Sequence, residues 1–238
     1  MKVSPDLENL YQDVLAQADP EKALHAQRFF KTGKGEYAQW DMFLWLTVPQ
    51  SRTIVKKYRN LSLQDLTTLI RSQRHEHRLI ALLIAVYQYN TSKDSHLHKQ
   101  LFDRYCNHTT YINNRDLVDT SAEHIVGQYL HDKDKTLLVD RAHSSLLRER
   151  RIAIIATFYE IKQSNPTDTI HIATLLLHDT HDLIHKAVWW MLREVGKRCK
   201  EKYLTDFLDQ YAKIMPRTML RYSIEKLSDE QKRKYMAN

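Results

Sequence analysis

The chain has 238 residues, a formal net charge of +7 and a hydrophobic content of 42%. This apolar content excludes a disordered chain, and its four glycines and five prolines argue against a loop-rich or β-rich fold. No apolar run approaches the roughly 18 residues of a membrane-spanning helix, and the first residues lack the apolar core of a signal peptide. The positive charge suits a polyanionic partner such as nucleic acid or an anionic membrane surface.

Helix-start patterns recur from one end of the chain to the other. Pro20 follows an aspartate, as expected at the first position of a helix, and Ser62 precedes an apolar run that it can cap. Pro166 separates one helix from the next, and Ser228 begins a capping box. The best strand candidate is the short stretch FLWLTVP at residues 43–49. The pattern as a whole predicts an all-α fold.

A loose internal repeat runs through these predicted helices. Four apolar segments with a basic residue near their start share it: HRLIALLIAVYQY, RDLVDTSAEHIVG, ERRIAIIATFYEI and HKAVWWMLREVGK. With Ala81, Val118, Ala153 and Ala187 as markers, the steps are 37, 35 and 34 residues, the length of a helical hairpin. Stacked hairpins form an α-solenoid whose inner helices line a concave face, so the basic residues would gather along one groove. The alternative is an irregular α-bundle with coincidental spacing.

The stretch YINNRDLVDTSAEHIVG at residues 111–127 has two interpretations. Residues 120–123 match S/T-x-x-E, a capping box, which places Asp119 just before a helix start where its charge favours the helix dipole. In the other interpretation, Asp119 is a carboxylate at the mouth of the groove, and Arg115 stands nearby to hold a phosphate.

Two clusters farther along the chain are candidates for contact with nucleic acid. Arg148, Arg150 and Arg151 open a helix, where they either form a solvated helix end or clamp a phosphodiester through forked donors. Trp189 and Trp190 are adjacent on a helix and point about 100° apart. Only one of them can face a groove squarely and stack on a base or a sugar, and the other belongs to the core.

Histidines form the remaining cluster. His181 and His185 stand four residues apart, a spacing that can bind zinc and that resembles the HD metallophosphohydrolases. No convincing set of further ligands accompanies them, so a polar turn followed by a helix start is the other interpretation. Cys106 and Cys199 lie far apart and form no CxxC pair, which indicates a reduced, cytoplasmic setting.

Four blocks together resemble the AlkD-like DNA alkylation repair proteins: FFKTGKGEYAQWDMFLWLTVP, NNRDLVDTSAEHIVG, KAVWWMLREVGKR and MPRTMLRYSIEKL. The resemblance runs from about Ala23 to the C-terminus. It implies HEAT-like helical repeats in an α-α superhelix whose basic concave face curves around duplex DNA. It also implies a monofunctional N-glycosylase that releases cationic N3- or N7-alkylated purines and uses no metal or cofactor.

The resemblance further implies roles for individual residues. Asp119 matches the catalytic aspartate, which stabilises the oxocarbenium-like sugar as the glycosidic bond breaks and orients the attacking water. Trp190 matches one wall of an aromatic cleft, and Arg151 matches an arginine that reaches the DNA backbone. Because the alkylated purine already carries positive charge, it leaves with little acid catalysis.

The chain departs from the family pattern at arginines and tryptophans. Arg115 replaces the tryptophan of the usual NNWD, and Arg148 replaces that of LWERR. Arg115 opposes a cationic substrate and supplies no aromatic face, so we expect weaker excision than in a member with both tryptophans. Trp40, Trp45 and Trp189 stand where relatives commonly carry glycine, and a packed interior would resist such bulk. Either these positions face open space or the groove is remodelled, with Trp45 or Trp189 as candidates to replace the lost wall.

We therefore predict a single domain over residues 1–238, acting as a monomer on duplex DNA that carries alkylated purines. The predicted catalytic residues are Asp119 and Trp190, and the predicted DNA contacts are Arg115, Arg148, Arg150 and Arg151. The first alternative is a non-catalytic DNA-binding protein that recognises damaged or distorted duplex, which the arginine at position 115 favours. A repeat scaffold for protein partners and a metal-dependent phosphohydrolase are the further alternatives.

Overall fold

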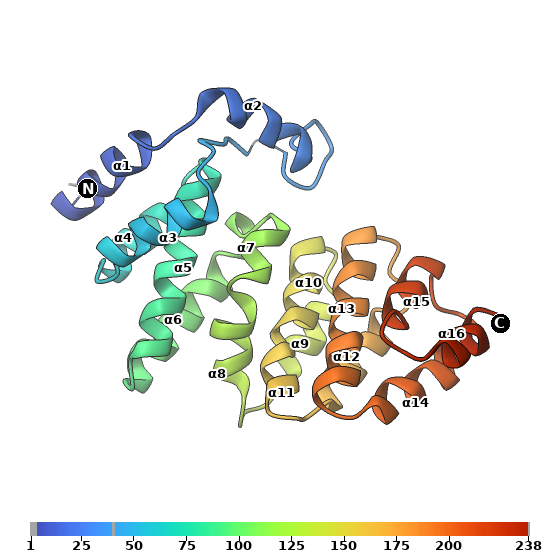
Figure 1. Ribbon diagram of the computed structural model, residues 1–238. Coiled ribbons are helices and arrows are strands. Elements are labelled where there is room, and N and C mark those ends of the chain that lie inside the picture. Colours follow the sequence, from blue (N-terminus) through green and yellow to red (C-terminus); the bar gives the residue numbers. More distant parts are fainter. Residues whose placement is uncertain (1–3, 40, 238) are drawn as a thin grey trace. The chain divides into compact units, whose positions relative to one another are not determined.

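The computed structural model describes residues 4–39 and 41–237. The chain divides into two compact units, Met1–Ile125 (unit 1) and Val126–Asn238 (unit 2). The described residues form helices and one isolated β-bridge, with no strand among them, so the prediction of an all-α fold is confirmed (Figure 1). A single domain over residues 1–238 stays a prediction. No helix in the described part of the chain is both long enough and apolar enough to cross a lipid bilayer.

Unit 1 is organised around its longest helix, α5. Its helices are α1 Pro5–Leu15, α2 Pro20–Phe29, α3 Val48–Lys57, α4 Leu63–Ile70, α5 His75–Thr91, α6 Ser95–Asn107, the 3₁₀ helix Thr109–Tyr111 and α7 Arg115–Asp119. The helices α3, α4, α6 and α7 all pack against α5. This central place explains why most residues in the first half of α5 are buried, charged ones included.

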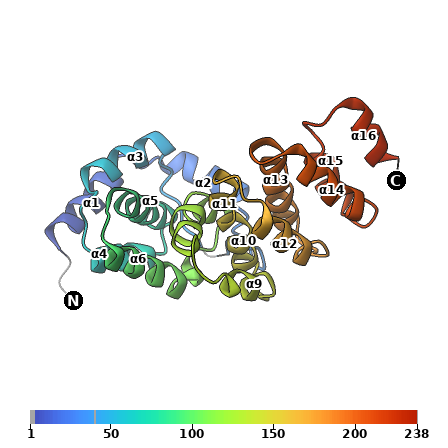
Figure 2. The same ribbon diagram turned by 90° about the horizontal axis from the view of Figure 1, so that it is seen from below.

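Unit 2 consists of helices that pack side by side. A π-helix, Glu123–Gly127, leads into α8 Gln128–Leu130, α9 Thr136–Ala142, α10 Leu147–Ala156, α11 Phe158–Lys162, α12 Thr167–Leu175, α13 Asp182–Arg198, α14 Glu201–Tyr211, α15 Arg217–Ser223 and α16 Asp229–Met236. Helix α10 packs on α9 and α13, and α13 in turn packs on α14 and α15 (Figure 2). The helix that carries the adjacent tryptophans is therefore central to unit 2.

The four markers of the sequence repeat are all buried on helices that pack within their own unit. Ala81 on α5 and Val118 on α7 are at most 1% exposed, and Ala153 on α10 and Ala187 on α13 are fully buried. Helix α5 contacts α7 in unit 1, and α10 contacts α13 in unit 2. The spacing of the repeat thus identifies the helices that form the two cores.

Helix starts with local capping chemistry form where the sequence predicts them. Pro20 is the first residue of α2. The hydroxyl of Ser62 accepts a hydrogen bond from the backbone N–H three residues on, at 3.1 Å. Ser228 and Gln231 form both bonds of a capping box, at 3.2 and 2.9 Å. Each of these contacts spans only three residues, so the local sequence determines it.

The predicted capping box at residues 120–123 is wrong. The N-cap of α7 is Asn114, whose side-chain oxygen accepts a hydrogen bond from the backbone N–H of Arg115 at 2.8 Å. The hydroxyl of Thr120 donates instead to the carbonyl of Asp116, at 2.8 Å, a bond that competes with capping. Asp119 therefore closes a short helix, and no capping box at Thr120 opens the π-helix that follows.

The strand candidate at residues 43–49 is not a strand. Met42, just before it, forms only an isolated bridge. The carboxylate of Glu76 accepts hydrogen bonds from the backbone N–H groups of Leu44 and Trp45, at 2.9 and 2.8 Å. Trp45 has φ of +56°, a left-handed conformation that glycine adopts without strain. A side chain of α5 thus replaces the neighbouring strand that this segment lacks.

Candidate functional site

Two of the predicted site residues lie on α7 in unit 1. Arg115 is the first residue of this helix and Asp119 is the last, and both are half-buried. Residues four apart lie on the same side of an α-helix. Helix α7 therefore presents a guanidinium and a carboxylate one turn apart.

The place of Asp119 in the repeat is unusual. The residues that follow the other three markers are Leu82, Ile154 and Val188, each at most 1% exposed. At the same position Asp119 is half-buried and carries a carboxylate. Because burial of a charge costs free energy that burial of an aliphatic side chain does not, packing alone does not account for this aspartate.

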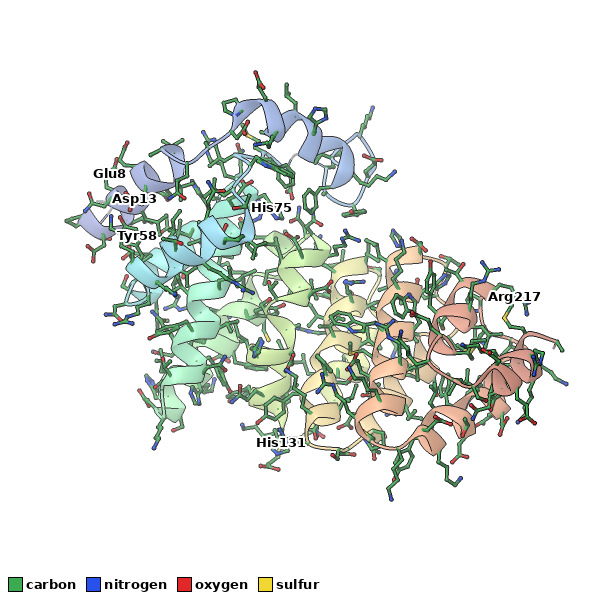
Figure 3. The ribbon with its side chains drawn as sticks, viewed as in Figure 1. Glu8, Asp13, Tyr58, His75, His131 and Arg217 are labelled. Atoms are coloured by element: carbon green, nitrogen blue, oxygen red, sulfur yellow. The ribbon has the colours of Figure 1, made fainter. Side chains whose placement is uncertain are left out.

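Asp116, the other acid of this stretch, contacts a buried histidine. Its Oδ2 lies 2.7 Å from Nε2 of His75, and its Oδ1 accepts a hydrogen bond from the backbone N–H of Leu117 at 2.9 Å. His75 is 3% exposed and lies at the N-terminal end of α5 (Figure 3). Asp116 therefore ties the first turn of α7 to the start of α5.

A second carboxylate faces the opposite nitrogen of the same ring. Oδ2 of Asp41 lies 3.5 Å from Nδ1 of His75, an ion-pair distance and too long for a good hydrogen bond. Oδ1 of Asp41 accepts hydrogen bonds from Arg78 at 2.8 Å and from Asn113 at 2.7 Å. We call these four residues together with Asp116 the His75 network. It joins two carboxylates to an imidazole and a guanidinium inside unit 1.

These contacts change the pKa values of the network. Burial alone would lower the pKa of His75, but Asp116 and Asp41 raise it to about 9. Burial alone would raise the pKa of Asp41, yet His75, Arg78 and Asn113 hold it below its ordinary value. His75 is therefore a cation at neutral pH, and its charge and that of Arg78 balance the two carboxylates.

Aromatic rings cover one side of the imidazolium. The ring of Phe43 stacks on that of His75 with 4.6 Å between centroids, and the ring of Phe30 lies 5.3 Å away. An aromatic face attracts a cation. The two phenylalanines thus favour the protonated histidine and exclude water from it.

In unit 2, two of the three predicted arginines are used in internal contacts. Arg150 donates from Nε to Asp179 at 2.6 Å and from Nη1 to the carbonyl of Ser144 at 2.9 Å. Arg151 is 5% exposed, and its Nη1 donates to the carbonyl of Leu183. Both side chains fasten α10 to the start of α13. Contact of Arg151 with DNA stays a prediction.

Arg148 differs from its two neighbours. No salt bridge or hydrogen bond joins its guanidinium to another residue of the described chain, and its Nε is buried. Burial lowers the pKa of the Arg148 guanidinium, while the adjacent Glu149 opposes this change. Of the three arginines, Arg148 is the one whose guanidinium has neither a hydrogen-bond partner nor an ion-pair partner among the described residues.

The adjacent tryptophans of α13 have different surroundings. Trp190 is half-buried, and its ring lies 5.9 Å from that of Phe158. Trp189 stacks on Tyr222 of α15 at 4.9 Å, and the guanidinium of Arg193 lies 4.7 Å from its ring. Trp189 is therefore packed between α13 and α15, which leaves Trp190 as the candidate for a groove wall.

The other two tryptophans that stand where the resemblance implies glycine belong to unit 1. Trp45 packs against the buried residues Ala23 and Phe43. Trp40 lies outside the described residues. Trp45 is thus part of a local aromatic cluster, and its positive φ accounts for the preference for glycine that the resemblance implies at this position.

His181 and His185 serve the start of α13. His181 is the N-cap, and its Nδ1 accepts a hydrogen bond from the backbone N–H of Leu183 at 3.1 Å. Nε2 of His185 lies 2.5 Å from the carbonyl oxygen of Asp179. Among the described residues there is no group of three or more His, Cys, Asp or Glu side chains that could hold a metal ion. The interpretation of this motif as a polar turn before a helix is confirmed.

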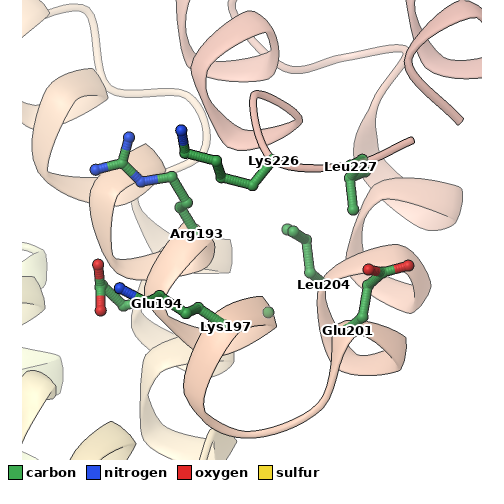
Figure 4. Close-up of a pocket in the computed structure, with 8 residues that line it drawn as sticks. Arg193, Glu194, Lys197, Glu201, Leu204, Lys226 and Leu227 are labelled. Atoms are coloured by element: carbon green, nitrogen blue, oxygen red, sulfur yellow. The ribbon is translucent and has the colours of Figure 1, made fainter. Parts of the chain in front are cut away.

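A cavity of about 530 Å³ opens beside the C-terminal half of α13. Arg193, Lys197 and Lys226 surround its apolar floor at Leu204 (Figure 4). Glu225 pairs with Arg193 at 2.7 Å and with Lys226 at 3.3 Å, so two of these cations already have a counter-charge. The residues that line this cavity include none of the predicted site residues.

The His75 network is the part of the candidate site that sequence reasoning missed. Its signal is the run HEHR at residues 75–78, four charged or polar residues that open an apolar helix and are at most 6% exposed. Adjacent residues point to different sides of a helix, so such a run indicates buried polar partners. Those partners, Asp41 and Asp116, are distant in sequence and become evident only in the folded unit.

The sequence and the fold are both similar to known proteins. A family model described as DNA alkylation repair enzyme matches residues 10–227. A solved structure, a predicted DNA alkylation repair enzyme from Enterococcus faecalis, is similar with a TM-score of 0.68 and 15% sequence identity, over 90% of this chain and 98% of that one. At this identity the likeness concerns the fold alone. No curated protein matches the sequence.

Proposed function

We propose that this chain, which belongs to the DNA alkylation repair enzyme family, is a monofunctional N-glycosylase that releases N3- or N7-alkylated purines from duplex DNA. The observation that carries the proposal is Asp119, a half-buried carboxylate at a repeat position where the other repeats bury aliphatic residues. A fixed carboxylate that packing does not require suits the stabilisation of a cationic sugar.

The chemistry follows from the charge of the damaged base. An N-alkylated purine carries positive charge, so it leaves readily with the electron pair of its bond to the sugar. Positive charge then develops on the sugar, where Asp119 stabilises it and orients a water molecule toward the same carbon. The proton of that water passes to the carboxylate or to solvent. Trp190 supports the sugar or base through its ring face.

We assign Arg148 to a phosphate of the DNA backbone. Its guanidinium is half-buried and has no ion-pair partner in the described chain, whereas Arg150 pairs with Asp179. A partly desolvated cation gains free energy from an external anion, and the forked donors of arginine match a phosphate. Arg150 and Arg151 would then support the groove mainly by holding α10 in place.

The test is the release of alkylated purines from methylated duplex DNA by wild type and by Asp119→Asn. We expect release by wild type and a single-turnover rate at least about 100-fold lower for Asp119→Asn, the size of effect seen when an electrostatic group is removed. The matched control is Asp140→Asn, which removes an exposed carboxylate of α9 and should leave the rate unchanged. Equal rates for wild type and Asp119→Asn would contradict the catalytic assignment.

A second candidate function is DNA binding without release of the base. Arg115 favours it, because a guanidinium one turn from Asp119 opposes a cationic purine and offers no aromatic face. In this case duplex DNA should bind wild type with an affinity that falls steeply between about 50 and 200 mM salt, while no purine is released. The Arg115→Trp variant would then be expected to release alkylated purines. An affinity for duplex DNA that hardly changes with salt would contradict DNA binding itself.

A further inference from the structure

We propose that His75 is a positioning residue: its imidazolium, held between Asp41 and Asp116, fixes the placement of the short helix that carries Asp119. The inference rests on the proposed function, because it concerns the placement of the same carboxylate. His75 lies at the N-terminal end of α5, a part of the molecule that the family resemblance did not indicate.

The position of α7 depends on its contacts, because the helix is short. The helix has only five residues, from the arginine to Asp119, and a helix of this length is not stable by itself. Its place therefore depends on what its ends contact. Asp116 in its first turn lies 2.7 Å from His75, and Asn113, two residues before the helix, donates to Asp41 at 2.7 Å. Both contacts lead to the same network.

The imidazolium of His75 has the central place in that network. Among the described residues, His75 is the network member that faces both carboxylates, Asp116 at 2.7 Å and Asp41 at 3.5 Å. Arg78 contacts Asp41 and Asn113 but not the helix itself. Without the charge on His75, two carboxylates would face each other across a neutral ring, and the carboxylate with access to solvent would move away. That carboxylate is Asp116, whose side chain is 29% exposed.

The charge state of His75 follows from the groups around its ring. The charged groups that face His75 are Asp41, Asp116 and Arg78. The two carboxylates outweigh both burial and the guanidinium, and they raise the pKa of His75 to about 9. The ring is therefore protonated at neutral pH, and the positioning effect should be lost as the pH rises through about 9.

His77 offers a matched control on the same helix. It is 6% exposed, with Nδ1 3.0 Å from the hydroxyl of Ser72 and its ring 4.8 Å from that of Tyr11. Burial and the nearby arginines lower the pKa of His77 to about 4, so it is neutral. Glutamine at either position removes a buried ring, but only His75→Gln removes a charge between two carboxylates.

The experiment compares wild type, His75→Gln and His77→Gln in single-turnover release from methylated duplex DNA at pH 7.5, with DNA affinity measured alongside. We expect His75→Gln to lower the rate at least about 10-fold while affinity changes less than about 2-fold, because a misplaced carboxylate fails in the reaction step. His77→Gln should keep the wild-type rate. Equal rates for the two variants would overturn the proposal. No release by wild type would overturn the proposed function, and this inference with it.

A pH series keeps the test decisive if His75→Gln does not fold. The wild-type rate should fall on the alkaline side as His75 loses its proton near pH 9. Asp116→Asn removes one of the two carboxylates that hold this proton, so the alkaline fall should move to lower pH. An alkaline fall at the same pH in wild type and Asp116→Asn would overturn the proposal.

Discussion

Arg78 in unit 1 and Arg150 in unit 2 occupy the same place in the repeat and anchor their helices in the same way. They lie 72 residues apart, which equals the repeat steps of 37 and 35 residues taken together. Each donates from Nη1 to the carbonyl six residues before it, Ser72 at 2.7 Å and Ser144 at 2.9 Å. An arginine at this position thus fastens a helix to the loop that precedes it.

The aspartates that pair with these arginines distinguish the two units. In unit 2, Asp179 pairs with its arginine at 2.6 Å and accepts a further bond from the backbone N–H of His181 at 2.8 Å. In unit 1, Asp41 also faces His75, which continues to Asp116 on α7. The repeat therefore predicts the arginine anchor but not its partners, and only the anchor in unit 1 reaches the helix with the candidate carboxylate.

The largest expected effect on stability comes from removing the arginine of each anchor in turn. Arg78→Met should lower the free energy of unfolding by about 3–5 kcal/mol, because it leaves a buried carboxylate without its guanidinium. Arg150→Met should cost less, about 1–3 kcal/mol, since the Arg150 side chain is 19% exposed while that of Arg78 is 4% exposed. Urea unfolding measures both values, and the exposed Arg52→Met on α3 controls for the lost charge. Equal losses of unfolding free energy in the two variants would contradict the expected difference between the anchors.

The second effect is a pH dependence of stability that follows from His75, because only the anchor in unit 1 includes a histidine. The pKa of His75 is about 9 in the folded protein and about 6.5 in an unfolded chain. The protonated ring therefore stabilises the fold below pH 6.5, and this stabilisation is lost as the pH rises through 9. We expect the free energy of unfolding to fall by about 3 kcal/mol between pH 6.5 and 9.5.

Urea unfolding at each pH tests this effect. His75→Gln should reduce the alkaline fall, whereas Arg150→Met should retain it because that anchor contains no histidine. A wild-type stability that stays flat over this range would show that the imidazolium does not stabilise unit 1.

The smallest effect compares a strained residue in each unit. Trp45 and Ser164 have φ of +56° and +62°. Ser164 and Asn165 donate to the carbonyls of Ile161 and Glu160, at 3.0 and 2.9 Å, which is the Schellman pattern that ends helices, usually with glycine. Ser164→Gly should raise the free energy of unfolding by about 1 kcal/mol. Trp45→Gly should not, because its ring packs on the aromatic cluster of unit 1. Thermal melting compares the two, and a lower melting temperature for Ser164→Gly would contradict the assignment.

The parts of the fold that the sequence predicts depend on short-range contacts. The caps at Ser62 and Ser228 join residues three apart, and both form. The repeat spacing also holds, because buried positions recur with the length of a helical hairpin. The capping box at Thr120 fails because Thr120 keeps a helical backbone as the C-cap of α7, and its hydroxyl donates back to the carbonyl of Asp116.

The candidate site was predictable only where it lies on one helix. The spacing of Arg115 and Asp119 places them on one side of α7 in any helical structure. The partners of Arg150 and Arg151 are 29 and 32 residues away, just before α13 and in its first turn, and no local sequence pattern relates them to α10. The contact between His75 and Asp116 could not be predicted for the same reason, because these residues are 41 positions apart in the sequence.

The bond from Glu76 to the segment before α3 has a consequence for aggregation. Residues 42–45 are the part of the chain most like a β-strand, and a strand with unpaired N–H groups is a template for another molecule. Here the N–H of Met42 donates to a carbonyl at 3.2 Å, and those of Leu44 and Trp45 donate to the Glu76 carboxylate. We therefore expect Glu76 to make this apolar segment less available for pairing with a strand of a second chain.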